Sequence, residues 1–218
     1  MIGYTILAKS LAQHKLEYCF GIVGVPVIEL GFAIQGEGIQ YFGCRNEQQA
    51  SYAAGAIGFL TKEPGLCLCV SGPGHTNAVS GLANAWSNSW PMILLSGASD
   101  LNQTSKQAFQ ECEQEAVARP YCKYTVRITD AASIPFIVEK AIRKSITGRP
   151  GPVYLELPGD LLKQTVEEAD IKWYNIPIEV PIFVPTEANI AKAIDLLRTA
   201  KNPLVIVGKG AAYSGAST

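Results

Sequence analysis

Short apolar segments that run into glycine-rich or polar turns recur through residue 157 of the 218-residue sequence, and helical patterns lie between them. Continuous apolar segments that alternate with helices are typical of a parallel sheet covered on both faces. We therefore predict an α/β domain with a doubly wound parallel sheet of about six strands and helices on both faces. The expected strands cover residues 17–24, 39–43, 66–70, 92–96, 124–128 and 153–157, and the expected helices cover residues 5–13, 27–35, 47–61, 75–88 and 132–147.

The character of the sequence changes after Pro158. Residues 163–173 are polar, and prolines recur among β-branched residues over 175–185, as in an extended linker. A helix is expected over residues 187–199 and a strand over residues 203–208. One helix and one strand cannot bury a core, so the sequence predicts a truncated chain. Its expected parts are a first domain (1–172), a linker (173–185) and the beginning of a second α/β domain (186–218).

The charge balance gives no support to a nucleic-acid or membrane-surface partner. Lys and Arg number 18, Asp and Glu number 19, and the formal net charge is -1 at pH 7. No apolar segment approaches the roughly 18 residues of a membrane helix. The six cysteines form no C-x-x-C pair and the sequence has two histidines, which argues against a zinc site. We therefore expect no metal ligands in this chain and a reducing compartment.

Three turns follow expected strands, and the carboxyl ends of parallel strands meet at the edge where α/β sheets bind ligands. They contain Gly24-Val25-Pro26, Asn46-Glu47 and Ser71-Gly72-Pro73-Gly74. Asn46 is a good N-cap, and Gln49 stands where it can close a capping box. Glu47 then lies in the first helical turn, and we expect it to become buried. It is either an ordinary helix-start acid, which the helix dipole favours, or a functional carboxylate, which the convergence of the three turns favours.

The turn Gly72-Pro73-Gly74 follows an expected strand and precedes a helix, as a dinucleotide-binding fingerprint does. Its sixth position, however, is Asn77 instead of a small residue, and no acidic residue stands at the expected distance after it. No Gly-Lys-Ser/Thr sequence occurs, which excludes a P-loop. The sequence therefore argues against an NAD site, and the turn could also be a helix start that binds nothing.

Four segments together resemble the amino-terminal, pyrimidine-binding domain of thiamine-diphosphate enzymes, in their order and spacing. They are Phe20–Pro26, Arg45–Gln48, Val70–Asn77 and Trp90–Gly97. Within that family the chain is similar to the 2-hydroxyacyl-CoA lyases and, next to them, the oxalyl-CoA decarboxylases. The shared segments are Gly148–Gly151 and Gly208–Tyr213, and Ala108–Glu111 is similar to the lyases alone.

The resemblance implies roles for individual residues. Glu47 would be catalytic, accepting a hydrogen bond from a ring nitrogen of the cofactor's aminopyrimidine. The residues implied for cofactor binding are Gly24, Val25, Pro26, Pro73 and Asn77. The residues implied for the substrate are Phe109, Gln110, Arg149 and Lys209, the last two for the ADP part of coenzyme A. The alternatives are a plain turn for Val25 and Pro26, a backbone cap for Asn77, a solvated side chain for Gln110 and surface cations for Arg149 and Lys209.

The resemblance also implies an activity: cleavage of a 2-hydroxyacyl-CoA to formyl-CoA and a shortened aldehyde. Oxalyl-CoA decarboxylase and an acetolactate-synthase-like carboligase are alternatives, and an inactive binding module is an alternative of another class. The implied cofactors are thiamine diphosphate and Mg²⁺. The domain that binds the metal carries Gly-Asp-Gly, which this sequence lacks. A homodimer or tetramer, an acyl-CoA substrate, and a peroxisomal or cytoplasmic location are also implied. The chain alone is expected to be inactive and to bind the cofactor weakly.

Overall fold

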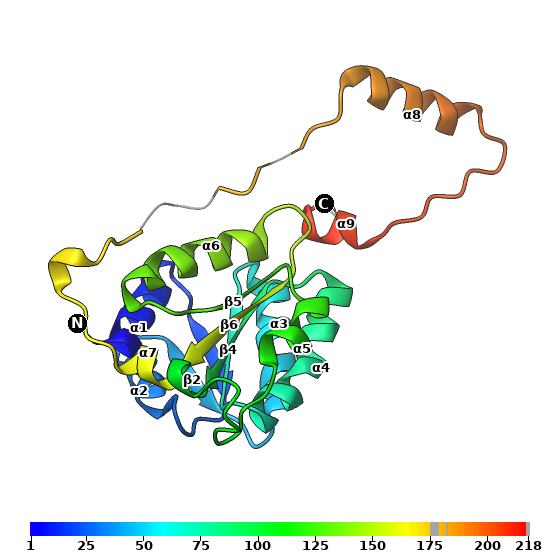
Figure 1. The fold of residues 1–218 in the computed structure, drawn as a ribbon. Coiled ribbons are helices and arrows are strands. Elements are labelled where there is room, and N and C mark those ends of the chain that lie inside the picture. Colours follow the sequence, from blue (N-terminus) through cyan, green and yellow to red (C-terminus); the bar gives the residue numbers. More distant parts are fainter. Residues whose placement is uncertain (175–178, 182, 217–218) are drawn as a thin grey trace.

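The computed structural model describes residues 1–174, 179–181 and 183–216. Its centre is a six-stranded sheet in which every pairing is parallel, with the strand order β2-β1-β3-β4-β6-β5 (Figure 1). The strands are β1 Tyr18–Gly21, β2 Gln40–Gly43, β3 Gly65–Cys69, β4 Met92–Ala98, β5 Tyr124–Arg127 and β6 Pro152–Pro158. This sheet confirms the predicted α/β class, and a strand forms in each of the six expected places.

Helices cover both faces of the sheet, as predicted (Figure 1). They are α1 Gly3–Gln13, α2 Ile28–Gly36, α3 Glu47–Thr61, α4 Pro73–Asn88, α5 Gln114–Ala118, α6 Ile134–Ile146 and α7 Gly159–Lys163. Short 3₁₀ turns cover Leu101–Gln103, Arg119–Tyr121, Ala131–Ser133 and Glu168–Asp170. One apolar core lies between the sheet and the layer of α1, α2 and α6, and a second lies beneath α3 and α4. Successive residues of β3 and β4 are all buried, because each face of these strands meets one of the two cores.

Small residues let α3 approach the sheet and α4 closely. A Cβ atom on Gly58 would lie 1.8 Å from the carbonyl oxygen of Pro91, and one on Gly65 would lie 2.1 Å from that of Ala54. A Cβ on Gly81 of α4 would lie 2.1 Å from the Ser51 hydroxyl. The glycines at these positions therefore have a packing reason, because a side chain at any of them would collide with its neighbour.

The strand order reverses between β1 and β3. From β1 the chain continues to β2 on one side, and it then returns to place β3 on the other side of β1. Such a reversal leaves a crevice at the carboxyl ends of the two strands, where α/β proteins bind their ligands. The turns that follow β1 and β3 are the glycine turns that the sequence analysis singled out.

The C-terminal part contains two helices, α8 Glu187–Thr199 and α9 Lys209–Tyr213. Thr186 caps α8, accepting a hydrogen bond from the backbone N–H of Asn189. Every residue of α8 is exposed, and Figure 1 shows this helix standing apart from the sheet. The strand expected over residues 203–208 is wrong: this segment pairs with no strand in the described part of the chain, and Leu204 is 86% exposed. A strand needs a neighbour for its backbone N–H and C=O groups.

Residues 175–178 and 182, within the predicted linker, lie outside the described residues. The domain limits at 172 and 186 therefore stay a prediction. No helix among the described residues is long and apolar enough to cross a membrane.

Candidate functional site at the carboxyl edge of the sheet

The turns after β1 and β3 meet at the side chain of Val70, and Glu47 from the turn after β2 lies beside Gly74. A Cβ on Gly24 would lie 2.7 Å from Val70 Cγ1, and one on Gly74 would lie 2.7 Å from Val70 Cγ2. The same added atom on Gly74 would lie 3.5 Å from Glu47 Oε1. The structure therefore brings Gly24, Glu47 and Gly74 together at one edge, which is the convergence that parallel strand direction predicts.

The carboxylate of Glu47 lies between the first turns of α3 and α4. Its Oε2 accepts a hydrogen bond of 3.1 Å from Asn77 Nδ2. Asn77 therefore holds this carboxylate and does not cap the backbone. Within the described residues, Glu47 Oε1 accepts no hydrogen bond. One oxygen is thus fixed by the protein and the other is left for a donor.

Two expectations about this helix start differ from the structure. Asn46 is the N-cap, as predicted, and its side chain accepts a 2.8 Å hydrogen bond from the N–H of Gln48. Gln49 is exposed, and its side chain makes no hydrogen bond with the described residues, so it closes no capping box. Glu47 is half-buried where burial was expected, since its edge of the sheet opens to the outside.

The turn after β1 is held by the ends of β4 and β6. A Cβ on Gly97 would lie 2.5 Å from Pro26 Cδ, and one on Gly159 would lie 3.2 Å from Pro26 Cβ. The Val25–Pro26 peptide bond is cis, and the N–H of Val27 donates a 2.7 Å hydrogen bond to the Gly24 carbonyl. Val25 is 66% exposed despite this anchoring. The turn thus presents an apolar side chain on a fixed backbone, as a cofactor contact requires.

The loop before α5 reaches the same edge. Gln110 accepts a 3.3 Å hydrogen bond from the Ser71 hydroxyl, so it is not merely solvated. Glu111 organises the loop by accepting hydrogen bonds from the N–H groups of Ser105 and Ala108, and these bonds lower the pKa of Glu111. Phe109 is 76% exposed and contributes an uncovered apolar surface. Pro73, at the first turn of α4, is also exposed.

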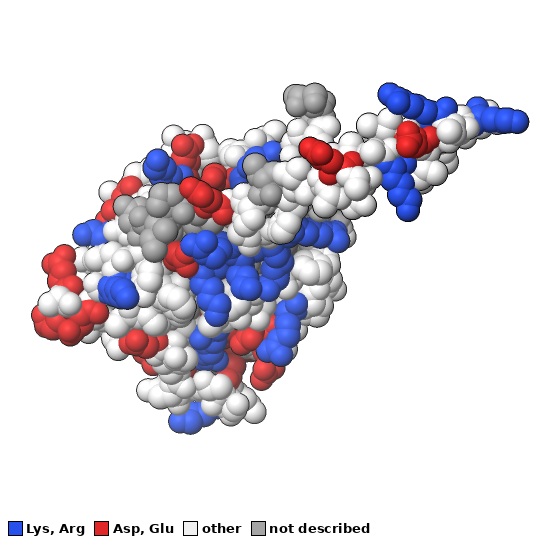
Figure 2. Space-filling view, turned by 90° about the horizontal axis from the view of Figure 1, so that it is seen from above, with Lys and Arg blue, Asp and Glu red and all other residues white. Residues whose placement is uncertain are grey.

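Arg149 and Lys209 lie elsewhere. Arg149 precedes β6, at the edge where the strands begin, and its Nε donates to the Ser89 hydroxyl at 2.8 Å. Lys209 donates to the carbonyl of Ser87 at the same end of α4. Figure 2 views the molecule from above relative to Figure 1. On the face seen there, Lys and Arg side chains gather near the middle. The structure therefore does not bring these two cations to Glu47.

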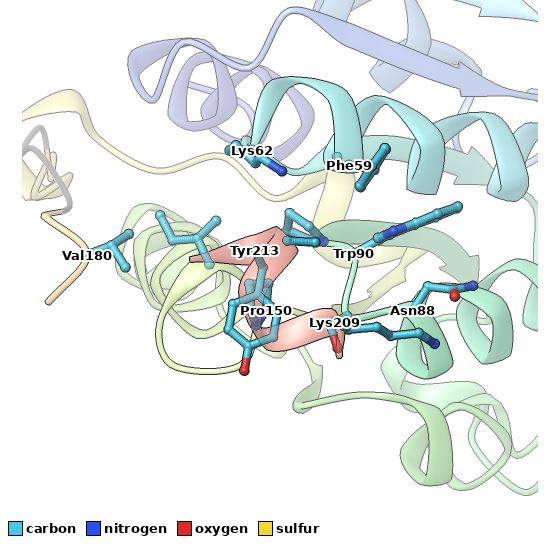
Figure 3. Close-up of a pocket in the computed structure, with 13 residues that line it drawn as sticks. Phe59, Lys62, Asn88, Trp90, Pro150, Val180, Lys209 and Tyr213 are labelled. Atoms are coloured by element: carbon cyan, nitrogen blue, oxygen red, sulfur yellow. The ribbon is translucent and has the colours of Figure 1, made fainter. Parts of the chain in front are cut away.

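A cavity of about 310 Å³ lies beside Lys209. Figure 3 shows it between the end of α3, with Phe59 in the helix and Lys62 directly after it, and α9, which contributes Lys209 and Tyr213. Its lining is largely apolar and includes Trp90. The cavity lies at the opposite edge of the sheet from the three turns, so it is not part of the site around Glu47.

Sequence reasoning missed a buried polar network directly behind the turn Ser71–Gly74. The Ser96 hydroxyl lies 3.0 Å from His75 Nδ1 and 3.2 Å from Cys69 Sγ. The imidazole of His75 packs against the Tyr154 ring, with the centroids 4.7 Å apart. Gln114 Nε2 donates to the Tyr154 hydroxyl at 3.0 Å. The sequence signal for this network was the presence of polar residues within or next to strongly apolar strands. Buried polar groups need hydrogen-bond partners, so such residues indicate a polar network.

The network is kept uncharged by burial. Burial lowers the pKa of His75 to about 4, and the backbone of Gln114 partly offsets this effect. Burial raises the pKa of Cys69 to about 12; the hydrogen bond with Ser96 opposes this rise, and the charge of Glu47 adds to it. His75 and Cys69 are therefore neutral near pH 7.

We predict that His75 stays neutral down to about pH 5, because its folded-state pKa of about 4 lies below the ordinary value of 6.5. Between these two values the unfolded chain binds more protons than the folded one, so stability falls as the pH falls through this window, by up to about 3 kcal/mol. Proton NMR of the imidazole checks this. In the His14→Asn variant only His75 remains, and a titration midpoint near 6.5 would contradict the prediction.

The sequence matches the family described as "Thiamine pyrophosphate enzyme, N-terminal TPP binding domain" over residues 1–117. It is 45% identical over 214 residues to 2-hydroxyacyl-CoA lyase 1 of Homo sapiens, which covers 98% of this chain and 37% of the human protein. It is 46% identical over 217 residues to 2-hydroxyacyl-CoA lyase 1 of Dictyostelium discoideum, with the same coverage. Oxalyl-CoA decarboxylase of Escherichia coli K12 is 42% identical over 218 residues, covering 98% of this chain and 39% of that protein. The chain thus spans less than two fifths of the length of these relatives.

Proposed function

The chain belongs to the thiamine pyrophosphate enzymes through their N-terminal TPP binding domain, and from this premise we propose that it forms the pyrimidine side of the active site in a 2-hydroxyacyl-CoA lyase. The proposed reaction cleaves a 2-hydroxyacyl-CoA to formyl-CoA and a shortened aldehyde. The observation that carries the proposal is the carboxylate of Glu47 at the crevice edge, with one oxygen held by Asn77 and the other accepting no hydrogen bond from the described residues. We use "assembled enzyme" below for this chain joined to the domain that binds diphosphate and Mg²⁺.

The residues at this edge fit an aminopyrimidine ring. An ionised carboxylate accepts hydrogen bonds only, so Glu47 Oε1 suits a ring N–H donor. Gly74 has no side chain between that oxygen and the turn, and a Cβ there would lie 3.5 Å from it. Val25 and Pro73 supply exposed apolar surface for the ring faces. Among the described residues no group of three or more His, Cys, Asp or Glu could hold a metal ion. We accordingly propose that Mg²⁺ and the diphosphate bind to the other domain.

Glu47 would stabilise a proton on a ring nitrogen of the aminopyrimidine. A hydrogen bond to an ionised acceptor is roughly twice as strong as one between neutral groups, and it strengthens when water is excluded. Asn77 holds the carboxylate in place, so the acceptor needs no rearrangement when the ring arrives. Thiamine diphosphate, when bound, supplies a carbon nucleophile that no protein side chain offers. Because Glu47 is half-buried in this chain, we propose that a second subunit covers this edge in a homodimer or tetramer.

The second candidate function is oxalyl-CoA decarboxylation, because the E. coli decarboxylase is 42% identical, close to the 45% of the human lyase. Phe109 and Gln110 favour the lyase, since they match its pattern at the loop that reaches Ser71. Both reactions release formyl-CoA, so the second product separates them. Supplying 2-hydroxyacyl-CoA and oxalyl-CoA to the assembled enzyme is expected to give an aldehyde from the first and no carbon dioxide from the second. Carbon dioxide from oxalyl-CoA without any aldehyde would favour the decarboxylase.

The purified 218-residue chain is expected to cleave neither thioester and to bind thiamine diphosphate more weakly than the assembled enzyme does. The reason is that it offers contacts to the pyrimidine but, in the described residues, no metal-binding cluster for a diphosphate. Isothermal titration calorimetry and a formyl-CoA assay on the chain alone measure both quantities. Sustained carbon–carbon cleavage by this chain without the diphosphate-binding domain would contradict the expectation.

A further inference from the structure

Gln114 is buried at the start of α5, with 2% of its surface exposed. A buried primary amide carries two N–H donors and an acceptor oxygen, and leaving any of them unpaired is costly. Gln114 comes directly after the loop that carries Phe109 and Gln110, so its side chain can fix the end of that loop.

All the hydrogen-bonding groups of the Gln114 amide have protein partners. Its Oε1 accepts a 2.7 Å hydrogen bond from the N–H of Gly72. Its Nε2 donates to the carbonyl of Gly97 at 3.0 Å and to the hydroxyl of Tyr154 at 3.0 Å. One side chain therefore ties α5 to the turn after β3, to β4 and to β6.

Gly72 is the residue through which this contact reaches the cofactor side. It precedes α4 with φ 58° and ψ -108°, a backbone conformation that side chains rarely allow, and α4 has no side-chain cap. A Cβ on Gly72 would also lie 2.7 Å from the Gln110 carbonyl oxygen. Gln114 and Gln110 thus hold the same glycine from two sides. The bond from the Ser71 hydroxyl to Gln110 Oε1 adds a third link between loop and turn.

We propose that Gln114 is a positioning residue that locks the substrate-side loop around Gln110 onto the cofactor-side turn around Pro73, acting through the N–H of Gly72. This rests on the proposed function, because the loop and the turn are assigned there to substrate and cofactor. The lock sets the spacing between the two reaction partners. A misplacement of about 1 Å at this spacing can cost about a hundredfold in rate.

The test compares three variants of the assembled enzyme. Gln114→Met keeps the side-chain size but loses the acceptor and both donors. Gln114→Glu keeps an oxygen that can accept from Gly72. Ser145→Ala is the matched control, because it removes one buried hydrogen bond, 2.7 Å long, from Ser145 to the Gly151 carbonyl at the opposite edge of the sheet.

Two readouts are expected to change together in Gln114→Met. Hydrogen–deuterium exchange of the Gly72 amide rises at least about tenfold, and kcat falls about tenfold to a hundredfold. Gln114→Glu keeps the Gly72 amide protected, and Ser145→Ala changes neither readout. Unfolding midpoints of all variants are measured alongside, to separate lost stability from lost positioning.

The proposal is overturned if Gly72 exchange in Gln114→Met equals that of the wild type, or if kcat falls no more than in Ser145→Ala. Should the unmodified assembled enzyme cleave neither thioester, the proposed function fails. Hydrogen–deuterium exchange of the Gly72 amide in Gln114→Met would still test whether Gln114 positions the turn. Should Gln114→Met not fold, Gln114→Glu decides: an unprotected Gly72 amide in that folded variant contradicts the role of the acceptor oxygen.

Discussion

Replacing Glu47 by Gln in the assembled enzyme is expected to lower kcat about 10²- to 10⁴-fold, the range for loss of a proton-handling group. The substitution keeps the size of the side chain, and its amide oxygen can still accept the hydrogen bond from Asn77. What it removes is the negative charge that we propose stabilises a proton on the facing ring nitrogen. Steady-state kinetics with a 2-hydroxyacyl-CoA measure the effect.

Glu29→Gln is the matched control for this substitution. Glu29 is an acidic residue in the first turn of α2, as Glu47 is in the first turn of α3. Both variants lose the favourable interaction with a helix dipole, worth about 0.3–1 kcal/mol of stability. Only Glu47→Gln is expected to lose activity. If kcat is the same in both variants, Glu47 is an ordinary helix-start acid, and an inactive binding module becomes the better interpretation.

Replacing Gly58 by Ala is expected to destabilise the protein by about 2 kcal/mol or more, which is the opposite of what helix propensity alone predicts. Alanine is about 1 kcal/mol better than glycine inside a helix, so propensity alone predicts a gain. The added Cβ, however, would lie 1.8 Å from the Pro91 carbonyl oxygen and 3.4 Å from Pro91 Cδ. Backbone that close must move, and overpacking of this kind costs about 1–3 kcal/mol, occasionally more. Urea unfolding of the 218-residue chain measures the difference.

Gly36→Ala supplies the comparison. Gly36 is also helical, at the end of α2, but an added Cβ there meets nothing within 4 Å. The Gly36→Ala variant is therefore expected to be as stable as the wild type, or more stable by up to about 1 kcal/mol. Both substitutions replace a helical glycine by alanine. If Gly58→Ala lowers the stability and Gly36→Ala does not, the loss at Gly58 comes from contact with Pro91. A stabilised Gly58→Ala variant would mean that α3 does not pack as closely as described.

The fold was predictable because its signals are local. Continuous apolar strands such as residues 66–70 and 92–96 indicate burial on both faces, and the glycine turns after them mark the carboxyl edge. The convergence of Gly24, Glu47 and Gly74 followed from strand direction alone. That Gly24 and Gly74 both approach the side chain of Val70 could not follow from it, because this depends on the order of strands across the sheet.

The remaining site features depend on partners distant in sequence. Gln114 stands in a polar stretch of sequence that matches no motif, yet its three hydrogen bonds join Gly72, Gly97 and Tyr154. The apolar segment 203–208 had a clear strand pattern, but the described chain gives it no neighbour to pair with. A sequence pattern indicates which local structure a segment prefers. The hydrogen-bond partners of a buried amide and the pairing of a strand depend on the segments that lie beside them in the fold.

Exchange of the cofactor's reactive C–H proton with deuterated water tests the role of Glu47 most directly, because it reports on proton handling without requiring a substrate. Proton NMR after rapid quenching gives the rate in the assembled enzyme and in its Glu47→Gln variant. We predict a rate about 10²- to 10⁴-fold lower in the variant, with thiamine diphosphate still bound and with Glu29→Gln unchanged. Equal exchange rates in the wild type and in Glu47→Gln would contradict the proposed catalytic role of this carboxylate.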